Sequence, residues 1–264
     1  MLGGNLLSIE AVEGYPGYAE GVPGYELVPA AQAMAAEAGA EFEMLPLLRV
    51  AKHSSGYSLG TAEGERTAKA LIVATGASPR KLGVPGEERL AGKGVSHCAS
   101  CDGPMLRGAG VAVVGGGDSA MQEALTLARY VDRVVLLCRS GALRGQATYR
   151  DRVLSAPKIE ARFQAQITAI EGDAAVSGVR LASGERLDVA AVFTYIGLQP
   201  NTTFLQDVVP LDPAGKLGTD GTMATERPGI FAAGLARAGS PGRAIASAGE
   251  GAAAAASAHR FLGG

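Results

Sequence analysis

Several residue types are scarce or missing in this sequence. It has no tryptophan, three cysteines and three histidines, and aromatic residues make up 5% of it. Three cysteines are too few for the disulfide framework of a small secreted protein. With a net charge of −2 and no basic run, binding to nucleic acid or to a membrane surface is not expected. No apolar stretch is long enough to span a bilayer, and the first residues do not resemble a signal peptide, so we expect a cytoplasmic protein.

Glycine, by contrast, is abundant, with 38 residues in a chain of 264, as expected for an α/β protein with many tight turns. A buried strand followed by Gly-x-x-Pro occurs twice, over residues 69–79 and 189–200. Two copies of one turn on either side of a complete nucleotide-binding unit predict one domain inserted into another. The predicted boundaries give a first domain from residues 1–80 and 199–264 and a second from residues 81–198.

A dithiol motif lies in the predicted inserted domain. Cys98 and Cys101 are two residues apart and Asp102 follows directly. Such pairs can close a small disulfide ring, and one thiol often has a lowered pKa that makes it a nucleophile near neutral pH. Asp102 could move a proton to or from the thiolate. The alternative is half of a zinc site including His97, but the remaining cysteine and histidines are scattered singly. We favour redox chemistry and expect no metal.

A dinucleotide-binding loop follows about ten residues later. Gly115-x-Gly117-x-x-Ala120 comes between an apolar strand at residues 111–114 and a helical pattern at residues 119–130. In this context the fingerprint predicts a pyrophosphate at the helix N-terminus. The next strand, residues 134–137, is followed by Arg139 and Arg144 and by no carboxylate. The arginines suit the 2′-phosphate of NADP(H), unless they are simply solvated surface residues.

The remaining pattern predicts several elements outside this core. Helices are expected over residues 26–38 and 244–261, strands over residues 40–45, 47–53, 56–59 and 229–233, and a β meander over residues 167–187. The small residues of the last helix are compatible with close helix–sheet packing alone.

Taken together, the motifs resemble the low-molecular-weight thioredoxin reductases, a flavin-dependent family. The matching runs keep the family's order and spacing along the whole chain: residues 12–17, 72–77, 94–103, 113–120, 196–202 and 228–234. The C-A-x-C-D-G run at residues 98–103 is highly specific to the family.

The resemblance implies a fold of two Rossmann-like, three-layer α/β domains, with an NADPH domain inserted into an FAD domain. It implies that NADPH reduces the flavin, that the flavin reduces the dithiol, and that the dithiol reduces a thioredoxin-fold protein. Cys101 would face the flavin, Cys98 would attack the partner, and Asp102 would be the acid/base. The family is dimeric. Its cofactor motifs fall on Thr75, Gly76, Gly115, Gly117, Asp118, Ser119, Ala120, Arg139, Arg144 and Gly234.

The departures from the family pattern concern FAD. The sequence begins after the family's strand–G-x-G-x-x-G–helix unit, which binds the ADP half of FAD, and Leu235 replaces the Asp that holds the FAD linker. In the family's Arg-rich NADPH motif, Cys138 and Ser140 replace two residues. A truncated sequence would explain the first departure but not Leu235, so we expect a natural loss of normal FAD binding. Three alternatives stay open: a reductase that holds FAD weakly or with the help of another chain, a flavin-free thiol-exchange relative, and a non-catalytic interaction protein.

Overall fold

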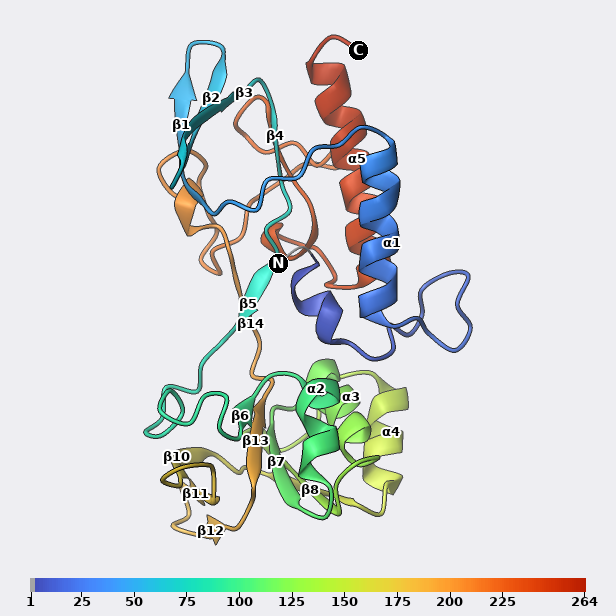
Figure 1. Ribbon diagram of the computed structural model, residues 1–264, viewed down its shortest axis with the longest axis vertical. Helices are drawn as coiled ribbons and strands as arrows, with labels where there is room; N and C mark the ends of the chain where they lie inside the picture. Colours follow the sequence, from blue (N-terminus) through green and yellow to red (C-terminus); the bar gives the residue numbers. More distant parts are fainter. Residues whose placement is uncertain (1–2) are drawn as a thin grey trace. The chain divides into compact units, whose positions relative to one another are not determined.

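The computed structural model describes residues 3–264, which divide into two compact units. One unit combines the chain up to Ser78 with residues Gln199–Gly264, and the other is Pro79–Leu198. We call them the discontinuous unit and the inserted unit. The chain passes between them along β5 (Ala77–Pro79) and β14 (Leu198–Pro200), which pair with each other (Figure 1). Each strand consists of the last three residues of one of the two predicted Gly-x-x-Pro segments.

The inserted unit is built around a parallel sheet of five strands in the order β6-β13-β7-β8-β9. Val111, Val113 and Phe193 are fully buried on one face of this sheet, which packs against helices α3 and α4. Ala112, Val135 and Val192 are buried on the other face, against the antiparallel sheet β10-β11-β12. This is the three-layer arrangement that near-continuous apolar strands predict. Its elements are β6 (Val95–Ser96), α2 (Ala99–Asp102), the 3₁₀ turn Gly103–Leu106, β7 (Gly110–Val114), α3 (Asp118–Leu127), β8 (Arg133–Cys138), α4 (Ala147–Ser155), β9 (Ile159–Phe163), β10 (Ile167–Glu171), β11 (Gly178–Leu181), β12 (Arg186–Leu187) and β13 (Ala191–Thr194).

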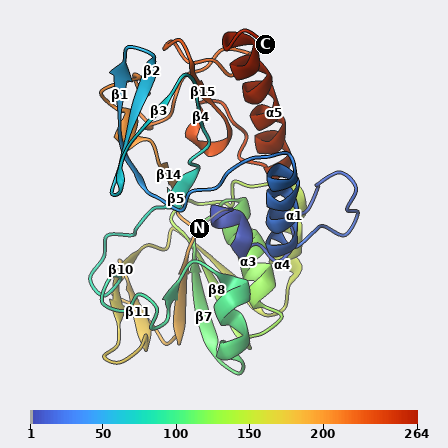
Figure 2. The same cartoon turned by 45° about the horizontal axis from the view of Figure 1, so that its top comes forward.

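The discontinuous unit also has three layers. Its centre is a parallel pair of strands from distant parts of the chain, β4 (Leu71–Val73) and β15 (Ile230–Ala232). Ile230 and Ala232 are buried on the side of the antiparallel meander β1 (Leu47–His53), β2 (Gly56–Thr61) and β3 (Gly64–Ala68). Phe231 is buried on the other side, against helix α5 (Ala244–Phe261). Figure 2 shows the meander and α5 on opposite sides of the β4–β15 pair. Helix α1 (Gly24–Glu37) and the 3₁₀ turns Gly4–Ser8, Thr203–Leu205 and Gly234–Ala236 complete the unit.

The α/β fold class is confirmed, and so are most of the predicted elements. Helix α5 has the predicted bounds, and α1 lies within two residues of its prediction, with Pro29 accepted in its second turn. The predicted strand at residues 40–45 is wrong, because these residues form no strand and β1 starts at Leu47. Phe42 and Met44, whose apolar character prompted the prediction, are 41% and 67% exposed and pack into no sheet. No helix formed by residues 3–264 has the length and apolar character that crossing a membrane requires.

Candidate functional site

The dithiol lies at the start of α2 in the inserted unit. Cys98 and Cys101 are joined in a disulfide, with 5.3 Å between their Cα atoms. Cys98 is the N-cap of α2, and its sulfur accepts a hydrogen bond from the backbone N–H of Cys101 at 3.2 Å. The N–H of Cys98 in turn donates to Ser96 Oγ at 3.0 Å. The bond from the Cys101 N–H places a donor on the Cys98 sulfur, which would stabilise a thiolate there after reduction.

The two cysteines differ in exposure, and their neighbours are fixed by the sheet. Cys101 is exposed and Cys98 is half-buried, while Asp102 ends α2 and is partly exposed. His97 Nδ1 lies 3.0 Å from the carbonyl oxygen of Thr194 and 2.9 Å from Thr194 Oγ1, so His97 is held at the end of β13. Within residues 3–264, no group of three or more His, Cys, Asp or Glu side chains is close enough together to hold a metal ion.

The glycine loop between β7 and α3 has the shape that the fingerprint predicts. Gly115 has φ +146°, and a Cβ atom there would lie 2.3 Å from the carbonyl oxygen of Tyr195 and 2.9 Å from Ala120 Cβ. Only glycine fits such a position. Gly117 is open, since a Cβ atom at this position would have no other atom within 4 Å, and Ser119 is exposed. The loop therefore leaves room beside the first turn of α3 for a ligand.

Asp118, the first residue of α3, connects the glycine loop to the loop after β8. Its carboxylate accepts hydrogen bonds from the backbone N–H of Gln146 at 2.7 Å and from Gln146 Nε2 at 3.1 Å. A Cβ atom on Gly145 would lie 2.2 Å from Asp118 Oδ1, so the two segments touch. Asp118 thus ties the loop after β8 to the start of α3, which is a positioning role.

The same loop brings the predicted phosphate-binding arginines to the glycine loop. The backbone N–H of Arg144 donates to the carbonyl oxygen of Gly116 at 2.8 Å, and its Nε lies 3.4 Å from Ser140 Oγ. Both Arg139 and Arg144 have exposed side chains. Cys138, the last residue of β8, is a free, buried thiol directly beneath Gly116. The backbone bond from Arg144 to Gly116 thus places the loop after β8 beside the glycine turn.

The remaining predicted cofactor residues belong to the discontinuous unit. Thr75 and Gly76 are tied to Asn201: Thr75 Oγ1 donates to its carbonyl oxygen at 2.7 Å, and the Asn201 N–H donates to the Gly76 oxygen at 3.0 Å. Gly234, with φ +68°, follows β15, and its N–H donates to Glu250 Oε2 on α5 at 2.7 Å. Leu235 comes next and is partly buried.

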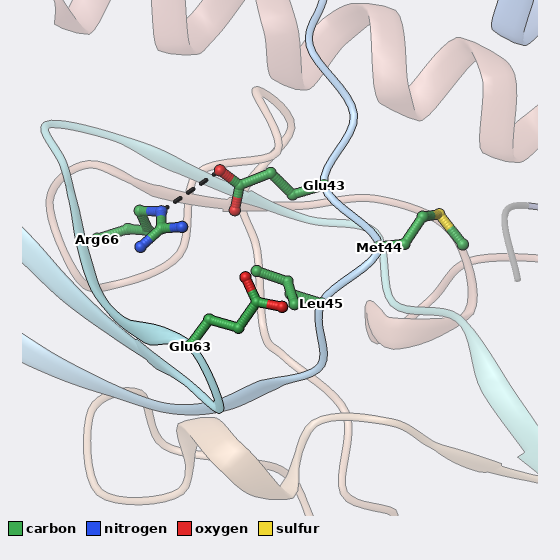
Figure 3. A pocket seen from close by; sticks show the side chains of 5 residues that line it. All are labelled: Glu43, Met44, Leu45, Glu63 and Arg66. Atoms are coloured by element: carbon green, nitrogen blue, oxygen red, sulfur yellow. Dashed lines mark hydrogen bonds and ion pairs between the residues drawn. The ribbon is translucent and has the colours of Figure 1, made fainter.

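A surface hollow elsewhere in the discontinuous unit contains none of the predicted site residues. It has a volume of about 320 Å³ and is lined by Glu43, Met44, Leu45, Glu63 and Arg66 (Figure 3). Arg66 Nε pairs with Glu43 Oε1 across it at 3.3 Å, and both side chains are exposed. Because its charged groups lie in solvent and one pair neutralises itself, we assign it no role.

Comparison with known proteins gives the family. Residues 20–251 match the pyridine nucleotide-disulphide oxidoreductase family. The chain is 39% identical to a thioredoxin reductase of Treponema pallidum, over 98% of this chain and 86% of that protein. It is 40% identical to a thioredoxin reductase of Mycolicibacterium smegmatis, again over 98% of this chain and 86% of that protein. The chain belongs to the low-molecular-weight thioredoxin reductase family.

The solved structures agree with this membership. The crystal structure of Lactococcus lactis thioredoxin reductase matches with a TM-score of 0.93 and 34% identity, over 98% of this chain and 87% of that one. The T. acidophilum thioredoxin reductase matches with a TM-score of 0.92 and 31% identity, over 99% and 88%. The two Rossmann-like domains expected from the resemblance are therefore the fold of this chain.

Two residues near the dithiol were not singled out by the sequence. Tyr195 follows β13, and its hydroxyl oxygen is buried and has no hydrogen-bond partner among the described residues. Glu123 is 9% exposed on the inner face of α3, beside the fully buried Met121 and Ala124. A carboxylate in the apolar stripe of a predicted helix was the signal available for Glu123. No local signal in the sequence marks the burial of the Tyr195 hydroxyl.

Proposed function

We propose that this chain is a thiol–disulfide oxidoreductase whose Cys98–Cys101 pair exchanges with a disulfide in a thioredoxin-fold protein. The Cys98 thiolate attacks one sulfur of the partner's disulfide, giving a mixed disulfide and one partner thiolate, which takes up a proton. Cys101 then attacks Cys98, which re-forms the Cys98–Cys101 disulfide and releases the second partner thiol. Two electrons pass to the partner, and Asp102 is the group that takes the proton from Cys101.

The observation that carries this proposal is the hydrogen bond from the Cys101 N–H to the sulfur of Cys98, in a disulfide at the protein surface. It makes Cys98 the better prepared of the two sulfurs to hold negative charge, which supports its role as the attacking thiol. The partly exposed Asp102 is adjacent to Cys101 in the chain, where a proton acceptor is required.

We further propose that the glycine loop of the inserted unit binds NADP(H). Gly115, Gly117, Ser119 and Ala120 would hold the pyrophosphate against the first turn of α3, and Asp118 keeps the loop in place through Gln146. Arg139 and Arg144 would bind the 2′-phosphate, because guanidinium groups match phosphate geometry and charge. The nicotinamide, when bound, supplies a hydride.

The residues that match the family's FAD linker site do not fit that group. Leu235 offers no acceptor for a ribityl hydroxyl, and it packs toward Gly242, where a Cβ atom would lie 3.2 Å from Leu235 Cδ2. The neighbouring Gly234 N–H is already bound by Glu250, which also pairs with Arg237 at 2.7 Å. The polar groups of this turn are thus directed at each other and away from a ligand.

From this misfit we infer that the chain binds no flavin and acts by thiol exchange alone. Electrons pass from NADPH to a disulfide only through a carrier such as flavin. Thr75 and Gly76, which match the family's FAD domain, close onto Asn201 in a structural turn. By family, the chain would work as a homodimer in the cytoplasm, without nucleic acid or membrane partners. The ordinary flavoenzyme is the alternative.

A single-turnover experiment tests the exchange reaction. The protein is reduced with dithiothreitol, freed of the reductant, and mixed with one equivalent of oxidised thioredoxin. Close to two thiols should appear on thioredoxin while two are lost from the wild-type chain. The Cys98→Ser variant should transfer none. Transfer at the wild-type rate by that variant, or none by the wild type, would contradict the proposal.

A further inference from the structure

The turn after β8 contains the two residues that depart from the family's arginine-rich motif, Cys138 and Ser140, and the structure joins them. The Ser140 hydroxyl donates to the carbonyl oxygen of Ala142 at 2.9 Å, and the Cys138 sulfur lies 3.2 Å from the same hydroxyl oxygen. Arg144 Nε donates to that oxygen as well, at 3.4 Å. The Ser140 hydroxyl is therefore where this turn contacts the guanidinium group of Arg144.

The backbone fixes the turn at two points. The carbonyl oxygen of Ser140 accepts a hydrogen bond from the N–H of Gln164, which follows β9, at 3.2 Å. Four residues further on, the N–H of Arg144 donates to the carbonyl oxygen of Gly116 in the glycine loop at 2.8 Å. Because both ends are tied to neighbouring segments, the Ser140 hydroxyl is an acceptor at a fixed place beside the Arg144 side chain.

The two exposed arginines of this turn are held differently. Ser140 restrains Arg144 at Nε, and its Nη1 and Nη2 groups have no hydrogen-bond or ion-pair partner among residues 3–264. The Arg139 side chain makes no hydrogen bond or ion pair within the same residues. A long side chain loses rotamer freedom when it binds a ligand, and it loses less where it is already restrained. Arg144 is thus the better prepared of the two to bind an anion.

Ser140 itself is poorly suited to bind a phosphate. Its hydroxyl has one proton, which is used in the bond to Ala142. The oxygen can then only accept further hydrogen bonds, and the oxygens of a phosphate also accept. A direct contact would require the bond within the turn to break, whereas the contact with Arg144 is already made. The hydroxyl therefore acts on the neighbouring guanidinium group.

We propose that Ser140 is a positioning residue for Arg144 and that it thereby strengthens the preference of this chain for a dinucleotide with a 2′-phosphate. This role rests on the proposed NADP(H) site and adds the residue that prepares one of its two arginines. With Nε bound to Ser140, the two Nη groups remain free, and paired N–H donors suit the oxygens of a phosphate. NADH has no 2′-phosphate, so its binding should not depend on Ser140.

Calorimetric titration of the full-length chain with NADPH and with NADH tests this role. Ser140→Ala should weaken NADPH binding by about threefold to tenfold, the range that one hydrogen bond is worth, and leave NADH binding unchanged. Ser155→Ala is the matched control, because it removes a serine hydroxyl of the same unit that donates to a backbone carbonyl of α4. This variant should bind both nucleotides as the wild type does.

Double variants show whether Ser140 acts through Arg144. Ser140→Ala should cause no further loss of NADPH affinity in an Arg144→Ala background and its full loss in an Arg139→Ala background. An equal loss in both backgrounds would mean that Ser140 contacts the phosphate itself, and would overturn the positioning role. A loss for NADH as large as that for NADPH would show a general loosening of the turn, and would overturn it too.

The wild-type titrations distinguish a failure of this role from a failure of the nucleotide site. Wild-type protein that binds NADPH no more tightly than NADH would refute the 2′-phosphate site, and the role of Ser140 with it. If the wild type prefers NADPH and Ser140→Ala keeps the whole preference at a wild-type melting temperature, the site stands and the role of Ser140 is refuted. The titrations use no thioredoxin and no turnover, so the exchange reaction is tested separately.

Discussion

The backbone N–H of Cys101 donates to the sulfur of Cys98, with 3.2 Å between nitrogen and sulfur. This bond, together with the disulfide, distinguishes these two cysteines from the third. Cys138 is 2% exposed at the end of β8, with Ser140 Oγ 3.2 Å from its sulfur. The position of Cys138 as a buried strand-end thiol is as the sequence predicts.

The cysteine arrangement predicts a reversible disulfide between Cys98 and Cys101 and a third thiol that stays reduced. Thiol counts on denatured protein, before and after mild reduction, should differ by two in the wild type and by none in Cys98→Ser. A difference of two that persists in this variant would show that Cys138 takes part.

The glycine loop predicts two different outcomes for alanine at neighbouring positions. Gly115→Ala should destabilise the inserted unit by about 2 kcal/mol or more, because the new Cβ meets the Tyr195 carbonyl oxygen at a positive φ. Gly117→Ala, with nothing near its Cβ, should fold normally. Thermal unfolding of both variants checks this, and equal melting temperatures would contradict the described loop.

The arginines predict a preference for the phosphorylated nucleotide. Calorimetry should show NADPH binding more tightly than NADH, and Arg139→Ala or Arg144→Ala should weaken NADPH by about 1.5–3 kcal/mol while leaving NADH little changed. Arg107→Ala, another exposed arginine of the inserted unit, is the control. NADH binding as tight as NADPH would refute the assignment of the 2′-phosphate site.

The ion pair between Glu250 and Arg237 predicts a pH-dependent contribution to stability. Their side chains are only 9% and 15% exposed. Burial acts to raise the pKa of Glu250, but hydrogen bonds from Arg237 and Gly234 outweigh it, so the pKa is lowered in the folded state. A lowered pKa gives stability that is present above the unfolded pKa of about 4.3 and is lost as the pH falls through the folded value.

Glu250→Gln should therefore cost about 3 kcal/mol at neutral pH, and the difference from wild type should shrink below about pH 4. Denaturant unfolding at several pH values measures it. Glu65→Gln is the matched control, because its pair with Arg49 is exposed and should not change the unfolding midpoint measurably. A pH-independent cost for Glu250→Gln would contradict the account.

The sequence predicted most of the inserted unit because its signals are local. Short stretches of sequence are enough to recognise the apolar strands β7, β8 and β13 by their hydrophobic pattern and the glycine fingerprint by its turn residues. Helix α4 was not predicted, since its mixed sequence buries only Tyr149 and Val153. The strand predicted at residues 40–45 failed for the opposite reason: apolar residues are present there, but no neighbouring strand pairs with them.

The site was predictable where one residue type decides the chemistry, as at Cys98, Cys101 and Gly115. It was not predictable where long-range packing decides. The motif places Asp118 beside the predicted cofactor, and only the structure shows that its carboxylate accepts hydrogen bonds from Gln146, 28 residues along the chain. Tyr195 and Glu123 become notable only once β13, α2 and α3 are brought together.

The central claim, a thiol-exchange protein without flavin, is tested most directly by the visible absorbance spectrum of the purified chain, read together with its NADPH-dependent reduction of thioredoxin. We expect a colourless protein with no such reduction. A yellow preparation with one flavin per chain and NADPH-driven reduction of thioredoxin would contradict the claim and make the protein an ordinary thioredoxin reductase.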